Sequence, residues 1–171
     1  PGGEQPDRFN RWVNDLLDEL HVQRSINFAT PDRDIYQVHR RYRGRDIFFS
    51  AKTGCTRCHT GPFYTDSRPK PHERIVRHNV GTGDDDPTET MGPAYDTPTL
   101  LGVYRTAPYL HHGLARTLEE VITVRNSSDK HGTTSHLTKP QIADLVAFLK
   151  SLPYEHPELS ATKARLTNIL D

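Results

Sequence analysis

The sequence predicts an all-α fold with long loops, and three observations lead to that prediction. Apolar residues recur every three or four positions over residues 9–20 and 142–152, as on one face of an amphipathic helix. Thr117 and Thr138 each stand at the start of such a segment, where a threonine caps a helix. Only 33% of the 171 residues are hydrophobic, and the 13 prolines and 11 glycines mark loops. The protein core is therefore modest unless a further group fills its centre.

The helical segments are predicted in chain order. Residues 9–20 form the first, in which Trp12 packs on the domain or faces a partner subunit. Residues 46–49 form a short segment behind a basic cluster at residues 40–45. A third helix begins at the cap Thr117, where Glu120 completes a capping box, and its apolar face consists of Leu118, Val121, Ile122 and Val124. A fourth begins at the cap Thr138 and carries an apolar stripe that ends at Pro153. A shorter helical stretch follows over residues 161–170.

The segment Cys55-Thr56-Arg57-Cys58-His59 has the spacing that attaches haem c covalently. On one helical turn the two sulfurs reach the two vinyl groups of one porphyrin, and the next imidazole points at the iron. A zinc half-site is disfavoured because structural zinc needs four ligands and the chain has only two cysteines. A redox dithiol and a disulfide are alternative interpretations of the two cysteines, but neither needs His59 or the following turn at Gly61-Pro62. These neighbours therefore favour haem attachment. One such motif predicts one haem per chain.

The overall composition restricts the partners of this chain. Its 22 basic and 22 acidic side chains give a formal net charge of zero, which supports neither nucleic acid nor an anionic membrane as partner. No stretch is apolar enough to span a bilayer. Haem c is attached outside the cytoplasm, so we expect an exported, periplasmic protein. The chain begins without a signal-like segment, which indicates a mature or trimmed chain or a piece of a longer protein.

Two polar features have more than one interpretation. The basic cluster at residues 40–45 is a solvated helix face, a docking patch for an acidic partner or a clamp on haem propionates. Residues 61–91 lack periodicity and predict a long loop. Residues 84–86 in that loop are three consecutive aspartates, which predict a solvated turn more readily than a calcium site.

Several blocks resemble, in order, the C-terminal domain of the bacterial dihaem cytochrome c peroxidase and MauG superfamily. They are GRDIFF at residues 44–49, the CTRCH motif with GPFYTD at 61–66, HNVG at 78–81, DTPTL at 96–100, TAPYLHHG at 106–113, TLEEV at 117–121, LT at 137–138 and DLVAFLKSL at 144–152. The resemblance implies a class I cytochrome c-like helical fold at residues 44–153, with an N-terminal helical extension at 1–43 and a partly helical tail at 154–171. It also implies a redox protein or other subunits as partners.

The sixth ligand of the iron is open at this stage. The superfamily takes a methionine from the helix after the TLEE block, where this chain has no methionine. We expect His131 to be the sixth ligand of the iron, since histidine is an established haem ligand. His136 is the next candidate, Met91 the third and an open site the fourth. Gly132 favours His131 because a glycine lets the backbone turn closely around an imidazole. The resemblance implies a buried structural role near the propionates for His111, and we expect His112 to be exposed.

The function predicted from these features is single-electron transfer by a monohaem c-type cytochrome that is part of a larger redox assembly. The alternative is a peroxidase-like haem domain completed by a second haem protein, for which His111 and His112 are the first candidates for acid–base chemistry. A haem module for ligand sensing, with residues 61–91 as its moving part, is a third possibility. No catalytic residue is predicted for the electron carrier.

Overall fold

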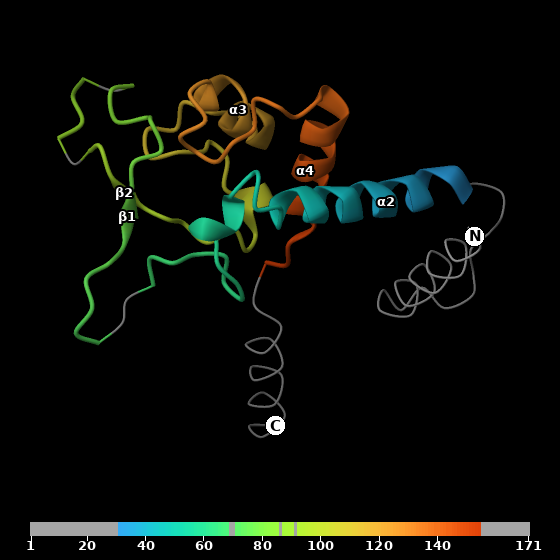
Figure 1. Ribbon diagram of the computed structural model, residues 1–171, viewed down its shortest axis with the longest axis horizontal. Helices are drawn as coiled ribbons and strands as arrows, with labels where there is room; N and C mark the ends of the chain where they lie inside the picture. The colour runs from blue at the N-terminus through green and yellow to red at the C-terminus, as the bar shows by residue number, and fades with distance from the viewer. Residues whose placement is uncertain (1–30, 69–70, 86, 91, 155–171) are drawn as a thin grey trace, which may run out of the picture. The chain divides into compact units, whose positions relative to one another are not determined.

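The computed structural model describes residues 31–68, 71–85, 87–90 and 92–154 (Figure 1). The helices predicted at residues 9–20 and 161–170, and the candidate ligand Met91, lie outside the described residues. The chain divides into two compact units, Pro1–Tyr36 and Gln37–Asp171, and the description below concerns the second.

The described elements confirm a mainly helical chain. They are helix α2 (Pro31–Phe48), the 3₁₀ turn η1 (Cys55–Arg57), strands β1 (Arg77–His78) and β2 (Tyr95–Asp96), the 3₁₀ turn η2 (Val103–Arg105), helix α3 (Leu118–Ile122), the 3₁₀ turn η3 (Val124–Asn126) and helix α4 (Lys139–Ser151). The strands form an antiparallel pair with Arg77 opposite Asp96. This small sheet is an addition to the predicted all-α fold. Among the described residues, no helix combines the length and the apolar character needed to cross a bilayer.

Both predicted N-caps are confirmed, whereas the capping box predicted for Thr117 and Glu120 does not form. The Thr138 side chain accepts a hydrogen bond from the Gln141 N–H, and the Gln141 side chain in turn accepts one from the Thr138 N–H. At α3, Thr117 accepts from the Glu120 N–H, but the Glu120 carboxylate accepts from the Arg116 N–H at 2.6 Å. Each cap satisfies N–H groups that the first turn of a helix leaves without a partner.

Val124 was expected on the apolar face of α3, and that expectation is wrong. Helix α3 ends at Ile122, and Thr123 leaves helical geometry with φ −127° and ψ −86°. The chain then continues as η3 in a new direction, so the Val124 side chain is 70% exposed. Leu118, Val121 and Ile122 are buried as predicted.

Helices α2 and α4 pack together at Gly44. A Cβ atom at this position would lie 1.9 Å from the Asp144 carbonyl oxygen, so only glycine allows the two backbones to approach this closely. The buried Asp144 carboxylate accepts hydrogen bonds from Arg43, at 2.6 and 3.1 Å, and from Arg40, at 3.2 Å. Two arginines of the basic cluster therefore neutralise a buried carboxylate on α4, while Arg41 and Arg45 are exposed.

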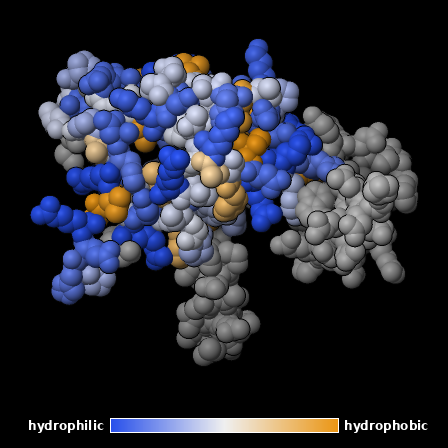
Figure 2. Space-filling view, in the orientation of Figure 1, coloured by the Kyte–Doolittle hydropathy of each residue, from blue (hydrophilic) through white to orange (hydrophobic). Residues whose placement is uncertain are grey.

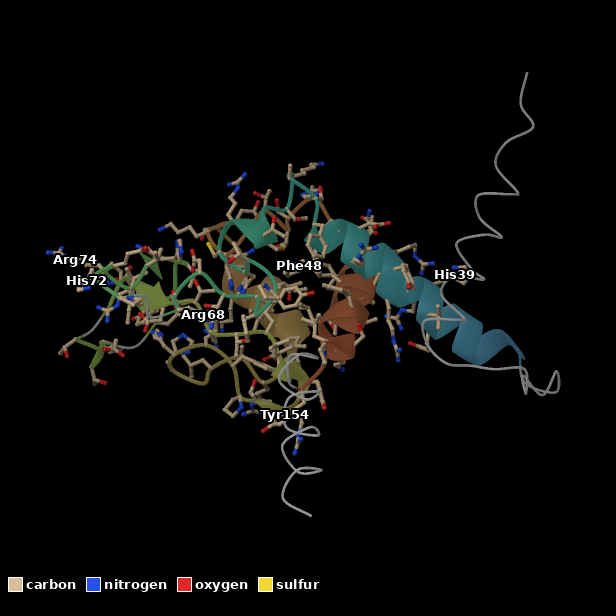
Figure 3. All side chains as sticks on the ribbon, turned by 90° about the horizontal axis from the view of Figure 1, so that it is seen from below. His39, Phe48, Arg68, His72, Arg74 and Tyr154 are labelled. Atoms are coloured by element: carbon tan, nitrogen blue, oxygen red, sulfur yellow. The ribbon has the colours of Figure 1, made fainter. Side chains whose placement is uncertain are left out.

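The core lies where the end of α2 meets α4. Figure 3 labels Phe48 at the end of α2, and its side chain is 2% exposed. The centre of its ring lies 5.2 Å from that of Phe148 and 5.8 Å from that of Tyr64. Buried residues in and next to η2, α3 and α4 complete the core: Leu100, Val103, Ala115, Leu118, Val121, Ile122, Ile142, Leu145, Leu149 and Leu152. Since α2 ends a few residues before η1, this packing sets the position of the cysteine segment.

We expect Gly44→Ala to lower the free energy of unfolding by about 3 kcal/mol, because the added methyl group overlaps the Asp144 carbonyl and separates the helices. Urea denaturation followed by circular dichroism measures the loss. Gly61→Ala is the matched control, since a Cβ at that position would meet nothing within 4 Å. Equal stability of the two variants would contradict the close approach of α2 and α4.

Candidate haem-binding site

The two cysteines lie on one tight turn, as their spacing predicts. The N–H groups of Cys58 and His59 both donate to the Cys55 carbonyl, at 3.4 and 3.0 Å. Both thiols are free and partly buried, and burial raises the pKa of each. A raised pKa disfavours the thiolate on which a reactive dithiol depends. The turn is therefore better suited to covalent attachment than to dithiol exchange.

Thr53 joins this turn to the end of α2. Its buried hydroxyl lies 2.5 Å from the Ile47 carbonyl oxygen and 3.0 Å from that of Ser50, so it satisfies carbonyls that the end of a helix leaves free. The Thr53 carbonyl accepts a hydrogen bond from the Thr133 N–H at 2.9 Å. One residue thus connects α2, the cysteine turn and the segment that carries His131.

His59 is held with one ring nitrogen available. Its Nδ1 lies 3.0 Å from the Tyr64 carbonyl oxygen. A carbonyl only accepts, so Nδ1 carries the proton and Nε2 keeps its lone pair. Burial lowers the pKa of His59, which favours the neutral ring. This tautomer is the one in which Nε2 binds a metal ion.

The His131 ring faces His59 at a distance that suits a shared iron. The two ring centres lie 6.2 Å apart with 38° between the ring planes. Imidazole nitrogens bind metal ions at about 2 Å and each ring centre lies about 1 Å further back, so two imidazoles on opposite sides of one ion have centres about 6 Å apart. Burial, with the nearby His59, lowers the pKa of His131 to about 4, so both rings are neutral at pH 7. The donor set therefore fits a haem iron between them.

Asn126 holds the segment that carries His131. Its side-chain oxygen accepts from the His131 N–H at 2.8 Å. Its side-chain nitrogen donates to the Gly132 carbonyl and to the Thr134 hydroxyl, both at 2.8 Å. The Thr134 hydroxyl donates in turn to the Ile122 carbonyl at the end of α3, at 2.7 Å. The buried Asn126 amide thus holds the loop both as a hydrogen-bond acceptor and as a hydrogen-bond donor.

Asp129 and Gly132 complete this loop. The Asp129 carboxylate accepts from the Ser135 hydroxyl at 2.6 Å and from the N–H groups of Thr134 and Ser135 at 2.8 and 3.0 Å. The hydroxyl bond, followed by the two N–H bonds, lowers the pKa of Asp129. Gly132 has a φ of 77°, as the predicted close turn requires, and a Cβ there would lie 2.9 Å from the Thr53 carbonyl oxygen. Sequence reasoning missed Asn126 and Asp129, because a polar run of this kind reads as a solvated loop.

The other predicted site residues lie elsewhere. His136 is exposed at the surface, near Asp129. The expectations for the adjacent pair His111 and His112 are wrong. His111 is exposed and stacks on the Tyr95 ring at 3.8 Å, whereas the His112 side chain is 4% exposed. His112 turns inward because Asp85 binds its Nε2, at 3.0 Å, and the Leu114 N–H binds its Nδ1, at 3.1 Å.

A second cluster, not predicted from the sequence, borders the cysteine turn. His78 Nε2 lies 2.7 Å from the Asp66 carboxylate. The ligand atoms of Cys58, Asp66 and His78 lie within 4.8 Å of one another, which is close enough to hold a metal ion when the thiol is free. A sulfur bonded to a porphyrin vinyl group loses its thiolate, so covalent attachment and this metal site exclude each other.

Comparison with known proteins places these features in a family context. No family model matches the chain. Hydrazine synthase subunit gamma from Kuenenia stuttgartiensis is 32% identical over an alignment of 149 residues, and the match covers 64% of this chain and 40% of that protein. Cytochrome c551 peroxidase from Nitrosomonas europaea is 31% identical over 114 residues, with 62% and 32% covered. MauG from Methylorubrum extorquens is 30% identical over 116 residues, with 63% and 33% covered.

Solved structures agree with these relatives. A MauG-like protein associated with microbial copper homeostasis superposes with a TM-score of 0.55 at 29% identity, over 68% of this chain and 47% of that one. The chain resembles the cytochrome c domain of the cytochrome c peroxidase and MauG superfamily. Kuenenia stuttgartiensis hydrazine synthase superposes with a TM-score of 0.54 at 30% identity, over 66% of this chain and 46% of that chain. The chain spans less than half the length of these relatives, and they support a haem redox domain.

We expect Asn126→Ala to lower the free energy of unfolding by about 3 kcal/mol, because the His131 N–H and the Gly132 carbonyl both lose their partner. Urea denaturation at pH 7 measures the loss. Ser127→Ala, at the exposed neighbouring position, is the control and should change stability by less than about 0.5 kcal/mol. Similar losses in both variants would show that the amide does not hold the loop.

Proposed function

We propose that this chain is a monohaem c-type cytochrome that transfers single electrons, as a domain or subunit of a larger redox assembly. The observation that carries the proposal is the half-buried pair His59 and His131, with ring centres 6.2 Å apart. In this proposal Cys55 and Cys58 attach one haem c, and the two histidines bind its iron from opposite sides. The domain has a class I cytochrome c-like fold over residues 44–153, with an N-terminal extension at 1–43 and a tail at 154–171.

The protein's part in this function is to hold both imidazoles neutral and oriented. The Tyr64 carbonyl sets the tautomer of His59, and Asn126 holds the backbone of His131. When bound, haem iron exchanges one electron at a time, and axial histidine gives a lower potential than methionine. With His59 and His131 both holding the iron, electron exchange would require no bond to form or break. A site whose two histidine segments are held by hydrogen bonds suits an electron carrier.

The alternative is a peroxidase-like haem domain that needs a second haem partner. Cytochrome c peroxidases among the relatives favour it. The positions of the histidines do not. His131 lies where an incoming ligand would bind, and both ring nitrogens of His112 are already occupied, by Asp85 and by the Leu114 N–H. The exposed His111 stacks on the Tyr95 ring.

The setting of the domain is also part of the proposal. Haem c attachment takes place outside the cytoplasm, so we propose an exported, periplasmic protein. Its partners are a redox protein or other subunits of a complex. One relative is by name a subunit of hydrazine synthase, which supports an assembly of several chains.

Replacing His131 by alanine should convert the ferric haem from low-spin to high-spin, because one axial nitrogen is lost. Absorption spectra of the purified haem protein in both oxidation states provide the measurement. His136→Ala is the matched control, since that imidazole is exposed five residues away, and its spectrum should equal that of the unchanged protein. A low-spin spectrum in His131→Ala together with a high-spin one in His136→Ala would reverse the assignment.

Hydrogen peroxide and cyanide, added separately, should leave the ferric spectrum unchanged over about a minute, because no axial position is open. His131→Ala should bind cyanide within seconds under the same conditions. Stopped-flow absorption distinguishes the two proteins. Rapid reaction of the unchanged protein with peroxide would favour the peroxidase-like alternative over the electron carrier.

A further inference from the structure

The Asp66 carboxylate lies beside the cysteine turn. One of its oxygens is within 4.8 Å of the Cys58 sulfur and of a His78 ring nitrogen. The Asp66 side chain is only 19% exposed, and the His78 ring binds it at 2.7 Å. In the proposed function the Cys58 sulfur is bonded to the edge of the porphyrin, so a charge on Asp66 acts on the haem at short range.

Hydrogen bonds of both neighbouring residues fix the position of Asp66. The Thr65 N–H donates to the Thr60 carbonyl at the end of the cysteine turn, at 3.0 Å, and the Thr65 hydroxyl donates to the Thr97 carbonyl at 2.6 Å. On the other side, the Ser67 hydroxyl accepts from the Thr97 N–H at 2.7 Å. The backbone on both sides of Asp66 is thus tied to the cysteine turn and to the chain beside β2, which holds the carboxylate next to Cys58.

Asp66 carries a negative charge at pH 7. Partial burial raises the pKa of its carboxyl group, but hydrogen bonds with the Thr97 and His78 side chains outweigh this effect, so the pKa lies below its ordinary value. The charge also acts on the site: after burial, it is the next cause that raises the pKa of the Cys58 thiol, and it opposes the lowering of the pKa of His59 by burial. The field of Asp66 therefore reaches both the sulfur and the imidazole of the attachment motif.

Charges in water act on this turn more weakly than Asp66 does. Arg57 lies between the two cysteines and lowers the pKa of the Cys58 thiol, but it is exposed, so water and salt screen its charge. Figure 2 shows that hydrophilic residues cover most of the visible face of the molecule, and charged side chains on such a surface are screened in the same way. Asp66 differs from them in its partial burial and its fixed position.

Reduction of a haem iron adds one electron and removes one positive charge, so a fixed negative charge nearby stabilises the oxidised form and lowers the reduction potential. We propose that the Asp66 carboxylate lowers the reduction potential of the haem attached at Cys55 and Cys58 in this way. His78 is a positioning residue, because its ring holds that carboxylate. The proposal rests on the proposed function, since Asp66 has this role only when haem is attached at the turn.

A redox titration of the purified haem protein, followed by its absorption spectrum, tests this role. Asp66→Asn keeps the shape of the side chain and removes its charge, so the equilibrium constant for reduction should rise about tenfold, which is about 59 mV for one electron. Asp66→Glu keeps the charge, and its equilibrium constant should stay within about twofold of the unchanged protein. Asp84→Asn is the matched control, because it removes an exposed carboxylate, and it should also stay within about twofold.

His78→Gln separates the effect of charge from that of structure. It keeps the charge of Asp66 and a side-chain N–H that can bind it, so the potential should stay unchanged, or fall if a charged imidazole is lost. Equal rises in His78→Gln and Asp66→Asn would overturn the proposal, because loss of local structure would explain both. An unchanged potential in Asp66→Asn, or the absence of haem from both Asp66 variants, would also overturn it and leave the proposed function intact. If the unchanged protein attaches no haem, the proposed function itself fails.

Discussion

Two neutral, half-buried imidazoles, His59 and His131, whose ring centres lie 6.2 Å apart, are the constraint on which the rest of the site depends. Removing a polar ring from water is costly unless its hydrogen-bonding atoms are satisfied, and each ring here must also keep one nitrogen available for a metal ion. The Tyr64 carbonyl meets this requirement for His59. For His131 the support is indirect, since Asn126 and Asp129 fix the backbone of the loop. Burial lowers the pKa of both rings and keeps them able to bind a metal ion.

The helices fix the start of the two segments that form the site, which are the cysteine turn with His59 and the loop with His131. Gly44 lets α2 lie directly against α4, and the Asp144 carboxylate holds the two helices together through Arg40 and Arg43. Because α2 ends a few residues before the cysteine turn, a change in this packing would displace Cys55 and its neighbours. The hydrogen bond from the Thr133 N–H to the Thr53 carbonyl joins the loop that carries His131 to the cysteine turn. Residues far apart in sequence thus meet with little regular secondary structure between them.

Hydrogen bonds from side chains to the backbone satisfy many main-chain N–H and C=O groups that helices or strands would satisfy in a more regular fold. Asn126, Asp129, Ser67 and Thr53 each satisfy main-chain groups in segments without a regular ladder. This explains how a chain with a modest apolar fraction holds long loops in place. It also explains why the polar run that begins at the last residue of η3 is structural at Asn126, Asp129 and Thr134.

The sequence by itself determined the features that depend on residues close together in the chain, which are the cysteine turn and the helix caps. The spacing of two cysteines and a histidine predicted the turn, and threonines three residues ahead of a partner predicted both caps, because these patterns act within one helical turn. Helix α4 and the family resemblance followed from apolar periodicity and from the order of the blocks. Tertiary structure decided the rest. Whether Val124 is buried depends on where α3 ends, and whether His111 or His112 turns inward depends on Asp85, 27 residues away from His112. The position of His131 opposite His59 depends on Asn126 and Thr53, whose roles arise only when distant segments pack together and must satisfy each other's buried polar groups.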